Sequence, residues 1–490
     1  MKHLFVCCDG TWNAPTAVHD GVPVPTNVVR FYNCVTEGSA SDAGVVQQLR
    51  YYHPGIGSSG SVFRRIYEGA TGSGISQNIR SAYKWLGDNF RSGEDKMFVV
   101  GFSRGAYTVR SLVGFLHRVG LIENPTWAEV ADAYRLYRGS RKRNAAAELK
   151  AFQERLAGRL KAPDVHFVGV WDTVGALGIP LSPPLSWIAL GLRRNQFHDT
   201  SLCSNVRNAY HAVAVDEQRA SFTPTLWTLT DNSAKNVRIE QAWFPGVHAD
   251  VGGGYQETGL SDGALEWMLE KATACGARFD SNLIRQIRPD PKGVLHDSYR
   301  GVFGLAKSQP RSMPYLSAAP PAPPPTQSLS SYVIARRADP PIAQCPYRAG
   351  RVLAVGEGAT VLVFAREPWN WTGLHVSRGE CYKFSTSPTQ EWRDAAINSN
   401  ASGYTRWWLW PFAWLKRLPR APWFCLSGAV GDAGNPTISG VPARETMFPI
   451  GTELRWTSTS DGYLYLFAND VDAFYFNNRG GLKVTVERLS

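Results

Sequence analysis

Short apolar runs alternate with amphipathic stretches along the N-terminal part of the chain. The runs are typical of strands buried on both faces, and the stretches repeat apolar residues at the spacing of a helix. Strands are predicted at residues 3–8, from residue 51, and at residues 97–100, 165–171 and 237–244. Helices are predicted at residues 75–90, 109–116 and 127–160, and from a cap at residues 197–200 to about Val215. This alternation predicts an α/β fold.

The pattern changes after Gly304. Residues 318–325 are all alanine and proline, which is typical of an extended, solvated linker. Beyond it, short runs predict strands at residues 351–365, 373–385, 454–456, 462–467 and 481–487. We therefore predict a catalytic α/β domain over residues 1–310, a connection over 311–349 and an all-β sandwich over 350–490.

Composition and charge narrow the class of protein. A chain of 490 residues is long enough for more than one domain, and no apolar run is long enough to span a bilayer. The N-terminus starts a strand at once and lacks a signal-peptide pattern, which predicts synthesis in a reducing cytoplasm. The eight cysteines show no metal-ligand spacing, and Cys7 and Cys8 are expected to be buried free thiols. The net charge of +11 is spread out, and its basic run at residues 138–143 is typical of a solvated helix face. We expect no nucleic-acid partner, whereas a basic surface suits anionic lipid.

A serine lies between the strand at 97–100 and the helix that follows it. Residues 101–105 have the sequence Gly-Phe-Ser-Arg-Gly, so Ser103 stands on a tight strand-to-helix turn. A side chain in place of either glycine would collide with neighbouring elements. The strand before and the helix after favour a nucleophile elbow over an ordinary glycine-rich turn, and Ser103 is the candidate nucleophile.

Two backbone regions are candidates for stabilising an oxyanion. The N–H of Arg104 points to where the negative charge would form, and the helix dipole favours charge there. Asp9 and Gly10 lie at the end of the first strand, where open α/β sheets place their sites. The amides of Gly10 and Thr11 are candidate second donors, and the alternative is a turn capped by Asp9.

The candidate acid and base follow the serine in the chain. Asp172 ends a predicted strand, where a hydrolase places its triad acid; a helix N-cap is the alternative. His248 lies in a glycine-bounded loop after a late strand and is the candidate base. The order Ser103, Asp172, His248 is that of α/β-hydrolases, although Asp250 is a candidate acid or an acceptor that fixes the loop. The weaker candidate histidines, two of them in the predicted last helix, are His198, His211 and His296.

Two apolar segments are candidates for contact with lipid. Residues 180–192 are proline-rich and suit a lid over the site, with a packed loop as the alternative. Residues 404–425 combine five tryptophans with cations, which suits a membrane interface, with a packed tryptophan-rich segment as the alternative. These tryptophans and cations are Trp407, Trp408, Trp410, Trp414, Trp423, Lys416, Arg417 and Arg420.

Four ordered motifs resemble one family, the bacterial α/β-hydrolase domain of uncharacterized proteins that includes the type VI secretion phospholipase effectors. The motifs are residues 8–13, 101–106, 170–175 and 244–255, and residues 197–200 and 216–217 fit as well. The resemblance implies a Ser-His-Asp lipolytic hydrolase with Ser103, Asp172 and His248 as the triad, a chemistry that needs no cofactor. It also implies a phospholipid or membrane surface, a secretion apparatus and an immunity protein as partners, and export by a type VI system.

The C-terminal part is similar to the PA-IL-like galactose-binding lectins. The likeness rests on residues 388–392, 469–471 and 477–478. In that family an aspartate and two asparagines bind a calcium ion that also holds sugar hydroxyls, so calcium and carbohydrate are implied here. The implied ligands are Asp470, Asn477 and Asn478, with Asp472 as a candidate second carboxylate. The family's tyrosine before the Pro-Thr-Gln segment is replaced by Thr386, a change that a backbone ligand tolerates.

The sequence thus predicts an α/β-hydrolase domain followed by a β-sandwich, lectin-like domain. The predicted function is hydrolysis of a lipid ester, in the first place of a phospholipid. Two alternatives stay open. One is an envelope- or carbohydrate-binding protein on an inactive hydrolase scaffold, and the other is a soluble esterase with a small substrate.

Overall fold

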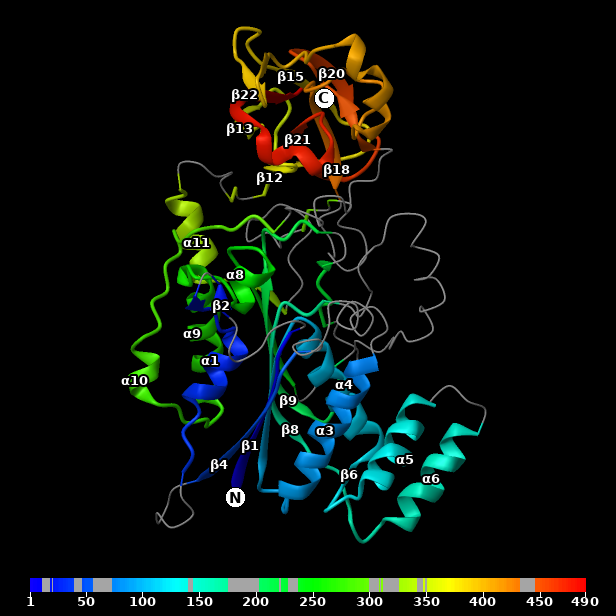
Figure 1. Ribbon diagram of the computed structural model, residues 1–490. Helices are drawn as coiled ribbons and strands as arrows, with labels where there is room; N and C mark the ends of the chain where they lie inside the picture. Colours follow the sequence, from blue (N-terminus) through cyan, green and yellow to red (C-terminus); the bar gives the residue numbers. More distant parts are fainter. Residues whose placement is uncertain are drawn as a thin grey trace. The chain divides into compact units, whose positions relative to one another are not determined.

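The computed structural model describes residues 1–10, 18–19, 21–38, 46–55, 73–139, 144–174, 202–219, 222–227, 237–298, 308, 310–311, 326–341, 347–348, 350–431 and 446–490. This part of the chain forms two compact units (Figure 1). Unit 1 contains Met1–Ala214 and Pro224–Leu295, and unit 2 contains Val215–Thr223 and His296–Ser490. The predicted lid at residues 180–192 and the alanine- and proline-rich linker at 318–325 lie outside the described residues.

Unit 1 is built on a parallel sheet. Its strands follow the order β10-β9-β8-β5-β1-β4, and each neighbouring pair is parallel. The order reverses between β1 and β5, a position at which open α/β sheets place their ligands beyond the carboxyl ends of the strands. The strands of this sheet are β1 (Lys2–Cys8), β4 (Gln47–His53), β5 (Lys96–Phe102), β8 (Val165–Trp171), β9 (Val206–Ala214) and β10 (Arg238–Phe244). Shorter strands are β2 (Val18–His19), β3 (Val22–Pro23), β6 (Leu121–Ile122) and β7 (Leu160–Lys161).

Helices cover both faces of this sheet, as the apolar runs of its strands predict. Figure 1 shows α1 and α9 on one side and α3 and α4 on the other. The helices of unit 1 are α1 (Asn27–Cys34), α3 (Ser73–Asn89), α4 (Arg104–Val119), α5 (Trp127–Arg138), α6 (Ala145–Arg155), α8 (His248–Gly252), α9 (Gly259–Ala274) and α10 (Ser281–Ile284). The predicted α/β fold of the N-terminal part is therefore confirmed.

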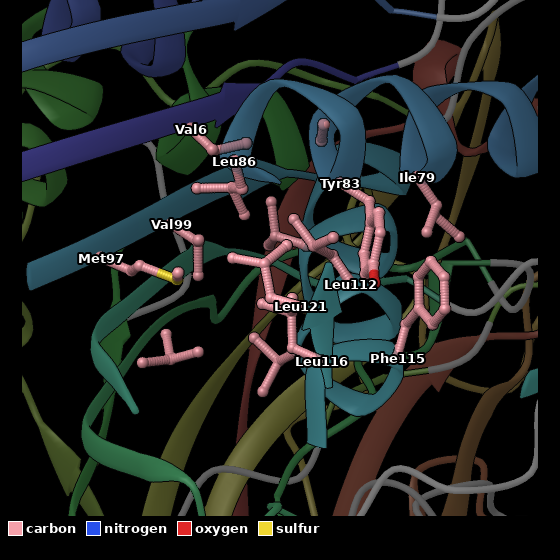
Figure 2. Close-up of a cluster of buried hydrophobic side chains, with 14 of the residues drawn as sticks. Val6, Ile79, Tyr83, Leu86, Met97, Val99, Leu112, Phe115, Leu116 and Leu121 are labelled. Atoms are coloured by element: carbon pink, nitrogen blue, oxygen red, sulfur yellow. The ribbon is translucent and has the colours of Figure 1, made fainter. Parts of the chain in front are cut away.

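The core under α3 and α4 holds the site-bearing turn in place. Figure 2 shows Tyr83 and Leu86 of α3 meeting Leu112 and Leu116 of α4 over the sheet. The Tyr83 hydroxyl donates to the carbonyl of Gly120 at 2.9 Å, so its one polar atom is satisfied inside the core. Each fully buried aliphatic side chain of this kind contributes about 1.5–3 kcal/mol, and α4 is thereby fixed behind Ser103.

The helix predicted from residues 197–200 to about Val215 is wrong over residues 206–214. These residues form β9, between β8 and β10 in the sheet. The run of Ala209, Tyr210, Ala212 and Val213 is almost wholly buried, because a central strand of a covered sheet has both faces inside. Alanine has the highest helix propensity, but propensity is a weak determinant of structure, and burial in the sheet overrides it here. The predicted cap at residues 197–200 lies outside the described residues.

Unit 2 is rich in β-structure, which confirms the predicted second β-rich part. Its two larger sheets have the orders β12-β14-β21-β18-β19 and β17-β16-β22-β15-β20, with β13 paired to β22. Side chains of both sheets form one core, including Leu374, Phe384, Leu464 and Val484. The elements are β11 (Gln327–Leu329), α11 (Ser331–Ala338), β12 (Arg351–Val352), β13 (Gly358–Phe364), β14 (Asn370–Val376), β15 (Cys381–Ser385), β16 (Trp392–Asp394), β17 (Ile397–Ser399), η4 (Trp407–Leu415), β18 (Leu426–Gly431), β19 (Phe448–Pro449), β20 (Glu453–Thr457), β21 (Gly462–Ala468), η6 (Asp472–Asn477) and β22 (Arg479–Arg488).

The tryptophan-rich segment of unit 2 has an exposed part and a buried part. The tryptophans of η4 are exposed, whereas Trp423 is buried. Lys416 and Arg417 are buried too, so the expectation that they accompany the tryptophans on one surface is wrong. Each is held by hydrogen bonds to carbonyl groups, those of Ala421 and Pro368 respectively, which compensate for the loss of water.

Two further expectations concern the cysteines and the absence of membrane-spanning segments. Cys7 and Cys8 are buried free thiols, as predicted, and burial raises the pKa of Cys8 to about 12. Such thiols are unreactive, because the thiolate is the nucleophilic form. Over the described ranges, no helix combines the length and the apolar character needed to cross a bilayer.

Candidate active site

Ser103 lies on the turn between β5 and α4. Its φ of 57° and ψ of −121° are a strained conformation for any residue other than glycine. The glycines on either side make this turn possible: a Cβ on Gly101 would lie 2.6 Å from the carbonyl of Gly105, and a Cβ on Gly105 would lie 2.1 Å from the oxygen of Cys8. The N–H of Ser103 donates to the carbonyl of Trp171 at 3.1 Å, which ties the turn to the end of β8.

Asp172 and His248 meet beyond the carboxyl ends of their strands. Oδ2 of Asp172 lies 2.5 Å from Nδ1 of His248, and its Oδ1 accepts the N–H of Ala214 at 3.0 Å. Both side chains are buried. A buried carboxylate at this nitrogen keeps the proton on Nδ1 and makes Nε2 the acceptor nitrogen of the ring, as a general base requires.

The ring of His248 is also packed against the serine turn. His248 begins the short helix α8, where the sequence predicted a loop. Its ring lies on that of Phe102, with centroids 4.6 Å apart, and Phe102 directly precedes Ser103. A Cβ on Gly252 would lie 2.0 Å from the Phe102 ring, so the last residue of α8 must be glycine for this packing.

Asp250 fixes the turn before α8. Its Oδ2 accepts the N–H of Val247 at 3.0 Å, and a Cβ on Gly246 would lie 2.3 Å from the Cβ of Asp250. Gly246 has a φ of 115°, a conformation that other residues rarely adopt. Of the two hypotheses for Asp250, the geometry supports the loop-fixing acceptor, and the contact with the imidazole belongs to Asp172.

Asp9 organises the turn at the end of β1. Its carboxylate accepts hydrogen bonds from the hydroxyls of Thr26 at 2.6 Å and Tyr52 at 2.8 Å, and from the N–H of Gly10 at 2.7 Å. Asp9 is thus an acceptor at the end of β1, and the residues after Gly10 that would complete the predicted turn lie outside the described residues. The Gly10 N–H points to this carboxylate, and Thr11 lies outside the described residues, so the oxyanion role of these two amides stays a prediction.

Arg104 begins α4 directly after Ser103. Burial lowers the pKa of its guanidinium to about 10, so the side chain remains cationic at neutral pH. The first N–H groups of a helix are without partners inside the helix, and the dipole adds partial positive charge there. The N–H groups without helical partners and the positive end of the helix dipole therefore both stabilise an anion at the start of α4.

The other candidate histidines have different positions. His211 lies in β9, fully buried, and its Nε2 accepts the N–H of Thr173 at 3.1 Å. It therefore supports the residue that follows Asp172. His198 lies outside the described residues, and His296 belongs to unit 2.

Sequence reasoning missed the residues that hold the site from behind. Phe102, Thr26 and Tyr52 contact His248 or Asp9, yet none of them stands at a position that a catalytic motif marks in the sequence, apart from Phe102. The position of Phe102 inside the glycine-serine motif was the one available signal. The contact of Ala214 with Asp172 is made by backbone and has no signal in the sequence.

The candidate calcium ligands of unit 2 lie together in part. Nδ2 of Asn478 donates to Oδ2 of Asp470 at 3.0 Å, and the Val471 N–H donates to Oδ1 at 2.7 Å. Burial, followed by the charge of Asp394, raises the pKa of Asp470 to about 7. The Oδ1 atoms of Asn477 and Asn478 are buried without a hydrogen-bond partner in the described structure. Hard oxygens that lack partners fit calcium.

Two further observations bear on a metal. Nε of Arg417 lies 3.3 Å from Oδ1 of Asp472, so that candidate second carboxylate has a cation beside it. A cluster of three or more His, Cys, Asp or Glu suited to a metal is absent from the residues that the structure describes. Any calcium site here therefore depends on the asparagines.

Comparisons with known proteins point to one family for unit 1. A family model described as "T6SS, Phospholipase effector Tle1-like, catalytic domain" matches residues 2–271. An uncharacterized protein of Saccharomyces cerevisiae is 28% identical over 247 residues, which are 46% of this chain and 33% of the yeast protein. The chain thus spans about a third of the length of that relative.

Solved structures give weaker similarities. An uncharacterized protein from Pseudomonas aeruginosa is 20% identical, with a TM-score of 0.36 over 59% of this chain and 49% of that chain. The Tle1 effector bound to the VgrG spike from the Type 6 secretion system is 18% identical, with a TM-score of 0.29 over 52% and 51%. The EclA N-terminal domain, a PllA-like lectin, is 21% identical, with a TM-score of 0.19 over 26% and 94%. These TM-scores are too low to assign a fold.

The family model covers residues 2–271 of 490, which is more than half of the chain. The match includes Ser103, Asp172 and His248 together with the whole parallel sheet of unit 1. The chain therefore belongs to the family of type VI secretion phospholipase effectors with a Tle1-like catalytic domain.

Proposed function

We propose that unit 1 is a serine hydrolase of the α/β-hydrolase fold that cleaves lipid esters, in the first place those of a phospholipid. The observation that carries the proposal is the buried pair of Asp172 and His248, packed through Phe102 against the strained turn of Ser103. Membership in a family of phospholipase effectors supports a lipid as the substrate. The nucleophile, the base and its orienting acid are the parts that acyl transfer needs.

In this mechanism Ser103 attacks the acyl carbonyl carbon through its Oγ while Nε2 of His248 takes the hydroxyl proton. Asp172 stabilises the imidazolium that forms, through the contact at Nδ1. The Arg104 N–H is the first donor to the oxyanion, with Gly10 and Thr11 as the candidate second donors. The ester C–O bond then breaks, the leaving alcohol takes the proton from His248, and water hydrolyses the acyl-enzyme by the same route.

The topology of unit 1 supports the fold assignment. The strand order reverses between β1 and β5, whose carboxyl ends carry Asp9 and Ser103. Ligands of open α/β sheets bind at such reversal points. The chain order of serine, aspartate and histidine is that of α/β-hydrolases, and each residue follows directly on a strand or begins a helix after one.

A second candidate function belongs to unit 2. Asn478 contacts Asp470, and the Oδ1 atoms of Asn477 and Asn478 are buried without a hydrogen-bond partner in the described structure, which favours a calcium site. A bound calcium ion supplies a positive charge that can hold sugar hydroxyls, which keeps a carbohydrate-binding protein as the alternative to the hydrolase. In that alternative unit 1 is an inactive scaffold; in a third, it is an esterase for small soluble substrates.

The family also suggests a cellular route. We propose that a type VI system exports this chain, and that parts of the secretion apparatus and an immunity protein are its partners. Comparing the protein in culture supernatant from a producing strain and from an isogenic strain without the secretion sheath tests it, and equal amounts would contradict it.

The decisive experiment for the enzyme compares the wild type with Ser103→Ala on mixed phospholipid vesicles, with products identified by mass spectrometry. Ser111→Ala is a matched control, because Ser111 is a buried serine about two turns further along the same helix. We expect fatty acid release by the wild type and the control only, and labelling of the same two proteins by a fluorophosphonate probe. Release by Ser103→Ala at the wild-type rate would contradict the mechanism.

A further inference from the structure

A cluster of exposed aromatic side chains projects from unit 2 at η4. Trp407 is 83% exposed, Trp410 81% and Trp414 70%. A helical segment that packs on a core buries one of its faces, whereas η4 buries none of its residues. Apolar side chains therefore face solvent on all its sides. The set, called here the aromatic knob, consists of Trp407, Trp408, Trp410, Phe412, Trp414 and Leu415.

The knob has a well-packed base. Arg417, two residues after η4, is buried with its guanidinium carbon 3.6 Å from the ring centre of Trp369 and 3.9 Å from that of Phe467. Its Nη1 donates to the hydroxyl of Tyr475 at 3.1 Å, and its Nε lies 3.3 Å from Oδ1 of Asp472. Arg417 thus fixes the C-terminal end of the knob to η6, and the exposed aromatics extend from a rigid support.

Only some of the tryptophans between residues 404 and 425 are exposed. Trp423, eight residues after the end of η4, is buried, and the ammonium of Lys416 lies 5.0 Å from its ring centre. The backbones of Tyr404 and Trp423 are hydrogen-bonded to each other in both directions, which closes the loop at its base. The segment therefore has a packed stem and an apolar tip, and the exposure of the tip does not come from a loosely held loop.

The chemistry of the knob fits a phospholipid bilayer. Tryptophan rings prefer the headgroup region, and the exposed Arg406 and Arg420 on the two sides of η4 suit lipid phosphates. Residues 407–415 carry no charged side chain, so their insertion removes no charge from water. Phe474 and Phe476 of η6, the element that Arg417 joins to the knob, are exposed as well.

Other occupants fit less well. A sugar site needs polar groups that converge on the hydroxyls, and residues 407–415 offer no charged side chain and mainly apolar rings. A helical peptide binds in a hydrophobic groove, whereas η4 buries none of its residues. A bilayer adapts to a convex apolar tip without a matching shape, because its headgroups and chains move aside.

We propose that the aromatic knob inserts into the headgroup region of a phospholipid bilayer and holds the protein at the surface that carries its substrate. The purpose of this docking rests on the proposed lipid hydrolysis by unit 1. The docking itself needs neither Ser103 nor a bound sugar.

The test measures sedimentation of the full-length protein with vesicles of phosphatidylcholine and phosphatidylglycerol. Replacing the three most exposed tryptophans by serine (Trp407→Ser, Trp410→Ser and Trp414→Ser together) should weaken partitioning about tenfold or more. The melting temperature should stay that of the wild type, because these side chains support no packing. Trp127→Ser is the matched control, since Trp127 is a 58% exposed tryptophan at the start of α5 in unit 1. Equal partitioning of the triple variant and the wild type would overturn the proposal.

Two more measurements identify the occupant. Acyl-brominated lipids should quench the tryptophan fluorescence of the wild type and the Trp127→Ser control more than that of the triple variant, which reports insertion. Vesicle binding that appears only with added glycolipid would make a sugar the occupant and overturn the proposal. Self-association of the wild type that the triple variant lacks, without vesicle binding, would make a second copy the occupant and overturn it too.

Vesicle binding by the aromatic knob and ester hydrolysis by unit 1 can be tested separately. The triple variant should hydrolyse a monomeric, water-soluble ester at the wild-type rate, and Ser103→Ala should bind vesicles as tightly as the wild type. A protein that binds vesicles through the knob and hydrolyses no ester would contradict the hydrolase and support the knob. A protein that hydrolyses the soluble ester and does not bind vesicles would support the hydrolase and contradict the knob.

Discussion

Nδ1 of His248 and Oδ2 of Asp172 lie 2.5 Å apart, although 76 positions separate the two residues in the chain. β8, β9 and β10 are consecutive neighbours in the sheet, so Asp172 after β8 and His248 after β10 come to the same edge. The intervening β9 contributes the Ala214 N–H that holds the other oxygen of the carboxylate. Residues at three adjacent strand ends thus hold one buried Asp–His pair.

The contact between Asp172 and His248 predicts different roles for Asp172 and Asp250. Asp172→Asn should reduce the turnover number by about 10³-fold or more, because the amide cannot hold the imidazole in the tautomer that accepts the serine proton. Asp250→Asn is the matched control: its effect should fall on the melting temperature, because the neutral amide oxygen is a weaker acceptor than the carboxylate for the Val247 N–H. Turnover and thermal unfolding of both variants decide the matter. Loss of turnover in Asp250→Asn with Asp172→Asn active would reverse the assignment of the acid.

The serine and the histidine should act as a unit. Ser103→Ala and His248→Ala should each remove nearly all esterase activity with the fold intact, and the double variant should be little worse than either single one. The reason is that the base has no proton to take once the hydroxyl is gone. Rates on a soluble ester and circular dichroism spectra of the three variants test this. Losses that multiply in the double variant would show that the two residues act independently.

The close approach at the serine turn predicts a stability effect. Gly105→Ala should destabilise unit 1 by about 2–4 kcal/mol, because the new Cβ would lie 2.1 Å from the carbonyl oxygen of Cys8 in β1. Gly93→Ala is the matched control, since a Cβ at Gly93 meets nothing within 4 Å, and its effect should stay within about 1 kcal/mol. Denaturant unfolding of both variants measures the difference. Equal stability would mean that β1 shifts away from the turn at little cost.

The predictable parts of the site are those that depend on local sequence. The turn of Ser103 needs glycine on both sides for steric reasons, so a strand, that motif and a helix are recognisable together. The ends of β8 and β10 are marked by a polar residue or a glycine after an apolar run, which placed Asp172 and His248 near one sheet edge. The choice between Asp172 and Asp250 required the fold. Asp250 lies close to His248 in the sequence, whereas Asp172 contacts its imidazole in space.

Properties set by distant contacts were not predictable. β9 was predicted as part of a helix and is a strand, because both of its faces are covered. The same limit applies to η4, since exposed tryptophans and buried cations reverse the usual preferences of these residue types. Arg417 is buried because Trp369, Phe467 and Tyr475 surround it, and they come from other elements of unit 2.

The last prediction concerns Asp470 and the pH dependence of stability. Burial and the charge of Asp394 raise the pKa of Asp470 from 3.8 to about 7, so the folded protein binds a proton there that the unfolded chain has released. The free energy of unfolding, measured without calcium, should therefore fall as the pH rises from about 4 to about 7 and change little above it, by at most about 4 kcal/mol. Calcium should reverse the loss above pH 7, because it takes the place of the proton beside Asn477 and Asn478.

Asp470→Asn tests both parts of this prediction, since the amide has nearly the same shape and no charge. In chelator, the variant should lose the part of the fall in melting temperature between pH 5 and pH 7.5 that Asp470 causes, and calcium should not raise its melting temperature. Asp461→Asn, at an exposed aspartate of unit 2 that caps the Arg378 N–H, should keep the wild-type pH dependence and calcium response. Scanning calorimetry of the full-length chain, with isothermal titration of calcium at pH 5 and pH 7.5, gives both quantities. If chelated wild type and Asp470→Asn share one pH profile and neither binds calcium, the Val471 N–H and the Asn478 amide already stabilise the charged carboxylate, and unit 2 is a module without a metal.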